Sequence, residues 1–353
     1  SNLIGFELND GSFRYVTEEK ANSLGKANAY RGDVVITHRG TLGQIVFIPS
    51  DSKFERYVIS QSQFRVKCNE KIMPEYLTYY FHTKIGQHKL LSNASQVGVP
   101  ALARASTSFQ ELEIEIPPMI QQQKVVSLLE TIRVKIELNN AINDNLEQQA
   151  RTLYQRMFID NPVSEGYMGT LSDIADITMG QSPNGSSYNE DGNGAVFFQG
   201  RAEFGFRFPS VRLYTTEPKR MACANDTLMS VRAPVGDLNV AYTDCCIGRG
   251  LAAIHSKSNQ QSFVLYTMFS LHKQLDVFNG EGTVFGSINR TALTELPIFI
   301  PSDREIVKFE AIVAPIDAAI RNNYEEICRL EKIRDALLTK LMSGELDVSA
   351  IEL

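Results

Sequence analysis

The chain has 353 residues, of which 43% are hydrophobic and 22% charged, and its formal net charge is −6. This length allows two or three domains, each with its own core, and the composition is ordinary for a soluble globular protein. No apolar run approaches the roughly 20 residues needed to cross a bilayer and no signal peptide is evident, so we expect a cytoplasmic protein. The five cysteines form no CxxC pair and the histidines are scattered, so we assign no metal site.

The sequence contains a long internal repeat, whose offset drifts from about 199 to 184 residues. Three pairs of segments carry it: 15–20 and 214–219, 32–43 and 225–236, 112–117 and 296–301. Because solenoid units run about 20–50 residues, this spacing indicates a duplicated domain. Aligning Tyr15 with Tyr214 leaves the first copy without a counterpart of about residues 167–199. We therefore expect the given sequence to begin inside its first domain.

The predicted elements of both copies follow one plan of strands and a helix. Apolar runs rich in β-branched residues predict strands at 33–37 and 44–48 around a glycine-bearing turn. Alternation predicts a strand at 64–67, and Pro74 opens a helix over 75–81 before a last strand at 112–116. The second copy predicts strands at 227–231, 239–242 and 296–300, a turn at 233–236 and a helix at 263–269.

Each copy leads into a helix of more than thirty residues. Apolar residues recur at alternating spacings of four and three over 309–341, a heptad seam in which Asn323 and Arg334 fill two positions. The same register, shifted by 184, runs over 125–157 with Asn139 and Asn143 as polar breaks. We expect the two seams to pack against one another in antiparallel fashion. The alternative is that each helix packs only on its own domain.

The predicted fold class is α+β, with two duplicated mixed α/β domains separated by two long antiparallel coiled-coil helices about a pseudo-twofold axis. The predicted parts are a first, N-terminally incomplete domain at 1–120, a first helix at 121–160, a second domain at 161–302, a second helix at 303–345 and a C-terminal tail at 346–353.

Charge is unevenly distributed along the chain. Residues 1–120 carry 13 basic against 12 acidic side chains, residues 167–300 carry 10 against 12, and residues 301–353 carry 7 against 11. Long-range electrostatics would give such a protein weak non-specific affinity for DNA. If the chain binds DNA, local arginines or a basic partner must carry the contact.

Catalytic motifs are weak throughout. Asn161-Pro162-Val163 fails the third position of the tetrad that a DNA amine methyltransferase needs, and the glycine-rich loop 280–286 alone is weak evidence for a nucleotide site. Asp10 with Glu18–Lys20 could suggest a metal nuclease, but Thr17 followed by acidic residues is typical of a helix N-cap. We assign no catalytic residue and no metal ligand to the chain.

The ordered motifs at 32–43, 112–118, 152–160 and 337–346 resemble those of the specificity subunit of type I restriction–modification systems. The resemblance covers the whole chain, except for the missing start of the first domain. It implies two target recognition domains that each read half of a split double-stranded DNA site, with the long helices as a ruler between the halves. It also implies two methyltransferase subunits and motor-nuclease restriction subunits as partners. S-adenosylmethionine, ATP and magnesium would be bound in those partners, and no cofactor in this chain.

Within this resemblance, the duplication sorts candidate DNA contacts by role. Arg39 and Arg232 are equivalent and lie beside turns, so we assign them to phosphate contact or turn architecture, the alternative being pairing with carbonyls of their own domain. Gln61 and Arg249 occupy equivalent places with different side chains, and glutamine can bridge adenine as arginine bridges guanine. For each residue, a plain solvated loop is the alternative. The DNA-binding candidates are Arg39, Thr41, Gln61, Gln96, Arg104, Gln181, Ser182, Asn184, Gln199, Arg201, Arg232, Arg249, Thr283 and Arg290.

Two other hypotheses remain open. The chain could be the recognition part of a single-chain restriction–modification enzyme, which a methylase tetrad upstream of Ser1 would support. It could also be a coiled-coil adaptor that does not bind DNA, which unchanged DNA affinity after substitution at positions 61, 201 and 249 would favour.

Overall fold

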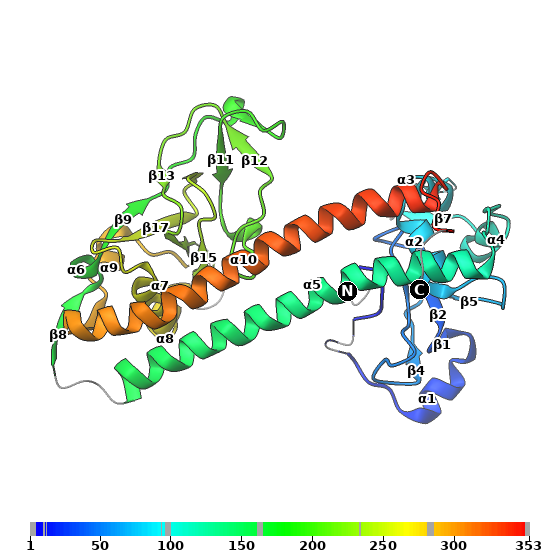
Figure 1. Cartoon of the computed structure of the whole chain (residues 1–353), viewed down its shortest axis with the longest axis horizontal. Coiled ribbons are helices and arrows are strands. Elements are labelled where there is room, and N and C mark those ends of the chain that lie inside the picture. The colour runs from blue at the N-terminus through cyan, green and yellow to red at the C-terminus, as the bar shows by residue number, and fades with distance from the viewer. Residues whose placement is uncertain are drawn as a thin grey trace. The chain divides into compact units, whose positions relative to one another are not determined.

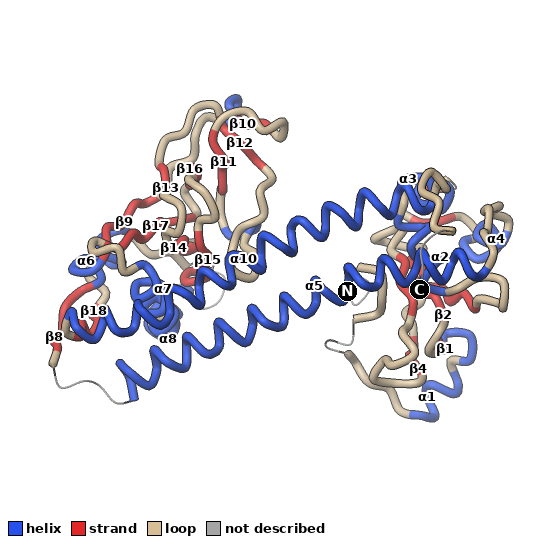
Figure 2. The backbone as a smooth tube through the Cα atoms, in the orientation of Figure 1, coloured by secondary structure: helices blue, strands red, loops and turns tan. Residues whose placement is uncertain are grey.

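The structure is a computed structural model of the chain that describes residues 5–9, 11, 13–92, 94–95, 100–160, 165–232, 234–280 and 286–349. It divides into two compact units, the first made of Ser1–Asn139 with Glu325–Leu353 and the second of Asn140–Tyr324. Each unit combines strands and short helices with one part of both long helices (Figures 1 and 2). The fold class is therefore α+β, as predicted.

The described part of the first unit has three small antiparallel sheets, β3-β2-β5, β1-β4 and β6-β7. Its strands are β1 Asn28–Tyr30, β2 Asp33–Thr37, β3 Ile45–Phe47, β4 Arg56–Val58, β5 Gln63–Lys67, β6 Ala94–Ser95 and β7 Ala101–Leu102. Its helices are α1 Glu18–Ser23, the short 3-10 helix η1 Gly25–Ala27, α2 Pro74–His82, α3 Lys84–Leu91 and α4 Ala105–Gln110.

Strand β2 is buried on both faces. Val34 and Ile36 point to one face, where they pack with Phe81 of α2, and Val35 points to the other, where it packs with Ile48. This follows from the two-residue repeat of a strand, and it explains why the run 33–37 is apolar without alternation. The hairpin and the helix after Pro74 are confirmed.

The N-cap predicted at Thr17 and the strand predicted at 112–116 have different outcomes. Thr17 Oγ1 accepts a hydrogen bond from the Lys20 N–H at 3.2 Å, which confirms the N-cap of α1. The predicted strand at 112–116 is wrong, because these residues pair with no strand in the described part of the unit. A strand needs a hydrogen-bonded neighbour, and the equivalent segment of the second unit has one in β8 (Gly166–Thr170).

The second unit has three sheets, of order β15-β14-β17-β9, β10-β12-β11-β16-β13 and β18-β8, whose strands are red in Figure 2. Its remaining strands are β9 Ala175–Met179, β10 Tyr188–Asn189, β11 Ala195–Phe198, β12 Leu213–Thr215, β13 Met221–Ala222, β14 Thr227–Val231, β15 Val235–Val240, β16 Cys245–Ile247, β17 Leu251–Ser256 and β18 Pro297–Pro301. Its short helices are α6 Leu171–Ile174, α7 Gln261–Ser270, α8 His272–Asp276 and α9 Arg290–Thr294, with 3-10 helices η3 Gly185–Ser187, η4 Arg201–Glu203 and η5 Val277–Asn279.

The strand expected at 239–242 begins earlier than predicted, at Val235. A register shift between Met229 and Val231 lets pairing with β14 continue past the turn. At this irregularity the Ser230 hydroxyl donates to the Pro234 carbonyl at 2.7 Å and accepts from the Asp237 N–H at 3.0 Å. A bulge of this kind leaves no clear pattern in a single sequence.

The two units share one strand arrangement. The order β3-β2-β5 of the first matches β15-β14-β17 of the second, and the pair β1-β4 matches β13-β16. Helix α2 follows β5 as α7 follows β17. The repeated sequence segments therefore fall on equivalent elements of the two units.

The long helices are α5, Met119–Tyr154, which continues as a π-helical segment to Asp160, and α10, Asp303–Met342. In the first unit, Val125 and Leu129 of α5 cluster with Leu338 and Leu341 of α10. Further along α5 in the first unit, Ile132 and Ile136 cluster with Ile327, which lies earlier in α10. In the second unit, Asn143 bonds to Asn323, whereas the later α5 residues 150–158 meet the earlier α10 residues 309–313. The order along the two helices is therefore opposite within each unit, which confirms the antiparallel pairing. No helix in the described residues is both long and apolar enough to span a membrane.

Polar residues in the seam pair with one another across the helices. In the second unit, the Asn323 Nδ2 donates to the Asn143 Oδ1 at 2.9 Å, and Asn143 is 2% exposed. In the first unit, the Asn139 Nδ2 donates to the Glu326 Oε2 at 2.8 Å. Such pairs fix the register of a coiled coil at some cost in stability.

Replacing Asn143 alone with leucine should lower the free energy of unfolding by about 1–3 kcal/mol, because the Asn323 amide loses its partner inside the seam. The double variant Asn143→Leu with Asn323→Leu should recover most of that loss, because both seam positions become apolar. Urea denaturation of the three proteins, followed by circular dichroism, measures both effects. A double variant no more stable than the single one would contradict the pairing.

Candidate nucleic-acid interface

Three backbone segments of the second unit converge at the ends of β9, β11 and β16. The Gln181 N–H donates to the Ile247 carbonyl at 2.9 Å, and the Gly248 N–H donates to the Phe198 carbonyl at 2.8 Å. The Gly250 N–H donates to the Gln199 carbonyl at 3.2 Å. We call the segments 180–182, 199–200 and 248–250 the glycine-packed tip.

Glycines make this close approach possible. A Cβ on Gly180 would lie 2.1 Å from the Gly248 carbonyl oxygen, and one on Gly248 would lie 2.8 Å from the Gln199 carbonyl oxygen. Both obstacles are backbone atoms, which cannot rotate away as a side chain can. Glycine in such a place usually marks a close contact between backbones.

The tip brings together four of the predicted DNA-binding residues: Gln181, Ser182, Gln199 and Arg249. The Arg249 N–H donates to the Ser182 hydroxyl at 3.3 Å, and the side chains of Gln181, Gln199 and Arg249 are exposed. No carboxylate of the described residues pairs with the Arg249 guanidinium. The tip therefore presents an unpaired cation and two amides from a rigid backbone, which are groups suited to base edges and phosphates.

Arg201 follows strand β11, as Gln199 does, but among the described residues its side chain is paired, unlike that of Arg249. Its guanidinium forms an ion pair with Asp237 of β15. This pair restrains the arginine and neutralises part of its charge, so Arg201 is a weaker candidate for DNA contact than Arg249.

In the first unit, Gln61 lies in the turn between β4 and β5, as Arg249 lies in the turn between β16 and β17. The Gln61 side chain is exposed, and its backbone carbonyl lies 3.2 Å from the His38 Nε2. The predicted equivalence of these two places agrees with the structure. Their role in base readout remains a prediction.

Arg39 and Arg232 also occupy equivalent places. Each follows the central strand of its sheet and forms an isolated antiparallel bridge, Arg39 with Ala101 and Arg232 with Ser287. Both arginines are exposed, and in the described part of the chain neither guanidinium donates to a carbonyl. What the two positions share is therefore the backbone bridge beside the turn, which favours a role in turn architecture.

The remaining candidates lie apart from the tip. Thr41 is exposed in the turn after β2, and Asn184 caps η3 by accepting the Ser186 N–H at 3.4 Å. Arg104 has a left-handed conformation, with φ of 46°, before α4, and Arg290 begins α9. Gln96 and Thr283 lie outside the described residues.

Sequence reasoning missed a buried ionic cluster in the second unit. Arg207 is 4% exposed, and its guanidinium lies 3.0 Å from the Glu147 carboxylate of α5 and 3.2 Å from the Asp317 carboxylate of α10. The Tyr266 hydroxyl lies 3.1 Å from the guanidinium and donates to Asp317 at 2.9 Å. Burial raises the pKa of the Asp317 carboxyl, and the charge of Arg207 opposes this shift. The position of Arg207 between two phenylalanines is the only signal that the sequence offers.

The first unit has a related cluster in which the arginine lies on the long helix. Arg133 of α5 lies 2.8 Å from the Glu7 carboxylate and 2.7 Å from that of Glu130, which accepts a hydrogen bond from Tyr79 of α2. Tyr79 of α2 and Tyr266 of α7 thus play equivalent parts in the two units. Each cluster connects the sheets and short helices of its own unit to a long helix. No group of three or more His, Cys, Asp or Glu side chains among the described residues could hold a metal ion.

Comparison with known proteins shows which proteins the chain resembles in sequence. Residues 4–148 match the family model of the type I restriction modification DNA specificity domain. The chain is 29% identical over 357 residues to the putative MjaX type I restriction enzyme specificity subunit of Methanocaldococcus jannaschii, covering 95% of this chain and 83% of that protein. It is 23% identical to the MjaIX specificity subunit of the same organism, covering 96% of this chain and 83% of the relative.

A solved structure shows the likeness of fold. The S subunit of a type I restriction–modification system from M. genitalium superposes with a TM-score of 0.54 at 16% identity, covering 90% of this chain and 84% of that one. Residues 4–148 thus match the specificity-domain family, and nearly the whole chain is similar to specificity subunits of type I restriction–modification systems. The resemblance found in the sequence motifs is thereby confirmed.

Proposed function

We propose that this chain is a specificity subunit that reads a bipartite double-stranded DNA site, one half with each unit, and performs no catalysis itself. The single observation that carries the proposal is the turn occupied by Gln61 in the first unit and by Arg249 in the second. The same scaffold presents an amide in one unit and a guanidinium in the other. Two such units would therefore read different half-sites.

The two long helices set the gap between the half-sites in this proposal. Helix α5 has 36 residues and α10 has 40, so each is roughly 50–60 Å long at about 1.5 Å per residue. The asparagine pair in the seam, Asn143 with Asn323, supports the idea, because a helix pair that fixes a distance must not slip in register.

Two methyltransferase subunits, and restriction subunits that move along and cut DNA, are the proposed partners. S-adenosylmethionine, ATP and magnesium would bind to those partners, and the complex would act in the cytoplasm. A net charge of −6 is weak support for DNA binding by the chain alone. Partners that enclose the duplex would supply the missing positive charge.

The substitution Arg249→Ala should relax base preference at one half-site only, by about 1–3 kcal/mol, and Gln61→Ala should do so at the other half-site. The measurement is methylation of a DNA library, randomised in both halves, by each variant in complex with the methyltransferase. Arg304→Ala, an exposed arginine at the start of α10, is the control and should leave both preferences unchanged. Equal loss of preference in both halves after Arg249→Ala would contradict readout by this turn.

A further inference from the structure

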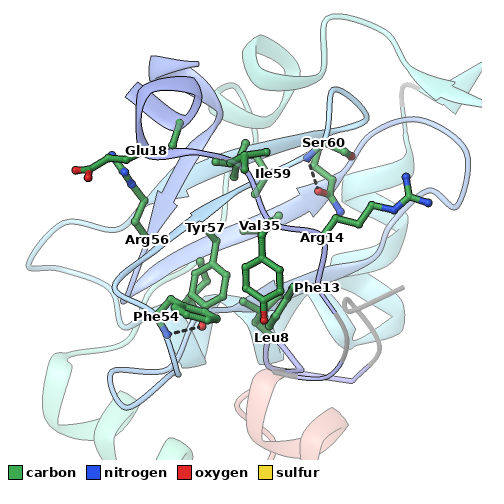
Figure 3. A pocket seen from close by; sticks show the side chains of 16 residues that line it. Leu8, Phe13, Arg14, Glu18, Val35, Phe54, Arg56, Tyr57, Ile59 and Ser60 are labelled. Carbon is green, nitrogen blue, oxygen red and sulfur yellow. Dashed lines mark hydrogen bonds between the residues drawn. The ribbon is translucent and has the colours of Figure 1, made fainter. Parts of the chain in front are cut away.

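Hollows in the two units differ in chemistry. In the first unit, a cavity of about 700 Å³ is lined by aromatic rings that pack on one another, with the centroids of Phe13 and Tyr57 5.6 Å apart (Figure 3). In the second unit, an open hollow of about 460 Å³ is lined instead by charged and aromatic side chains, among them Arg151, Arg201, Asp237, Phe204, Phe269 and His272. We call it the arginine hollow.

Arg151 of α5 is held flat against an aromatic ring at this hollow. Its guanidinium carbon lies 3.6 Å from the ring centroid of Phe269 of α7. Its Nε and one terminal nitrogen lie 2.9 and 2.7 Å from the Glu147 carboxylate, whereas the other terminal nitrogen has no partner among the described residues. The side chain is 41% exposed. A guanidinium restrained in this way presents its remaining N–H groups in a fixed direction.

Arg201 also keeps N–H groups in reserve. Only one of its terminal nitrogens pairs with Asp237, and its Nε and other terminal nitrogen have no partner in the described part of the chain. The two side chains are 46% and 40% exposed, and an ion pair so exposed is weak. A phosphate can therefore displace the carboxylate, because it can accept two parallel hydrogen bonds from one guanidinium.

The arginine hollow adjoins the glycine-packed tip along the backbone. Gln199 belongs to the tip, and Arg201 begins η4 only two residues later. Because consecutive Cα atoms are about 3.8 Å apart, these two backbones are separated by at most about 8 Å. A duplex whose base edges meet Arg249 at the tip thus carries its phosphates past the hollow.

The repeat shows that the hollow belongs to one unit only. The alignment of 32–43 with 225–236 places Gln44 opposite Asp237, and the shift of 184 between the long helices places Asp335 opposite Arg151. The aligned positions of the first unit therefore carry neither this carboxylate nor this arginine. Any contact made by the hollow is confined to one half-site.

We propose that the arginine hollow seats one phosphate of the DNA backbone, and that Asp237 occupies Arg201 until DNA binds. The phosphate accepts hydrogen bonds from Arg151 and Arg201, and Arg201 exchanges its carboxylate partner for the phosphate. Because a phosphate carries no sequence information, this contact positions the duplex, and Asp237 lowers the affinity for every sequence alike. Stable binding then depends on base contacts at the tip. The inference rests on the proposed function in one respect, that the chain binds DNA.

Asp237→Asn tests the exchange, because it removes the charge and nearly keeps the shape of the side chain. In complex with the methyltransferase subunit, this variant should bind cognate and unrelated duplexes about two- to fivefold more tightly than the parent chain. Adding Arg201→Gln should abolish that gain. Arg201→Gln alone, or Arg151→Gln alone, should make the plot of log affinity against log salt concentration shallower by about 0.9, and equally for both duplexes. Fluorescence anisotropy over a series of salt concentrations measures these effects.

Asp176→Asn is the matched control, because Asp176 is an exposed carboxylate of the same unit that pairs with Lys257 at 3.8 Å and does not line the hollow. It should change neither the affinity nor the salt dependence. A gain equal to that of the control, a gain that survives Arg201→Gln, or weaker binding by Asp237→Asn would overturn the inference. A changed methylation motif after Arg201→Gln would do so too, since a phosphate contact leaves base preference intact. These results would leave recognition by Gln61 and Arg249 standing, whereas a parent complex that binds no duplex would overturn both proposals.

Discussion

Replacing Arg207 with methionine is expected to lower the free energy of unfolding by about 3–5 kcal/mol, because the buried Asp317 carboxylate loses the cation beside it and Glu147 is left with Arg151 alone. Arg207 is 4% exposed, and it joins Glu147 of α5 to Asp317 of α10 and to Tyr266. The substitution removes two ion pairs, and it also removes the contact that joins the sheets of the second unit to its parts of α5 and α10.

Chemical denaturation of the full chain, followed by circular dichroism, measures the effect. The control is Lys257→Met, because Lys257 and Asp176 form a pair at 3.8 Å with side chains 44% and 72% exposed. Exposed pairs contribute little, so the control should change stability by less than about 1 kcal/mol. Adding Glu147→Gln and Asp317→Asn to Arg207→Met should recover part of the loss, since the unpaired charges disappear. A loss no larger than that of the control would show that the cluster contributes little.

Gly180→Ala is expected to disrupt the glycine-packed tip and, with it, recognition of one half-site. The new Cβ would lie 2.1 Å from the Gly248 carbonyl oxygen and 2.8 Å from that of Ile247. The turn that carries Arg249 must move, at a cost in stability of about 1–3 kcal/mol. Sequence-specific DNA affinity of the complex should fall at least tenfold, because Arg249, the side chain proposed to read bases, is displaced.

Gly185→Ala, a few residues along the same loop, provides the matched control. A Cβ there has nothing within 4 Å, so both stability and DNA affinity should remain near those of the parent chain. Filter binding or fluorescence anisotropy of the complex with its cognate duplex compares the two variants. If Gly180→Ala binds the duplex as tightly as Gly185→Ala does, the tip is not a DNA contact.

The sequence is most informative where a pattern extends over many residues. The heptad seams run through more than thirty residues each, so both long helices and their antiparallel pairing are predictable. The strands around Val35 and the helix after Pro74 carry strong local signals, and the structure confirms them. The strand expected at 112–116 is wrong, because strand formation depends on a neighbour that a local pattern cannot supply.

The candidate interface is predictable only in part, for a related reason. The repeat alone is enough to place Gln61 and Arg249 at equivalent turns. Their neighbours cannot be inferred in the same way, because Gln181 reaches Arg249 through pairing of β9 with β17, and Gln199 through pairing of β11 with β16. Such long-range pairings, like the buried contacts of Arg207, leave no periodic trace in the chain.

Methylation mapping tests the central claim most directly. The chain would be produced with its methyltransferase subunit, the complex purified, and adenine methylation of genomic DNA sequenced at single-molecule resolution. Our account predicts a stable complex that methylates one split motif, with Arg249→Ala changing one half of that motif and leaving the other half and the gap intact. A chain that binds no methyltransferase, or a complex that methylates DNA without any motif, would contradict the account.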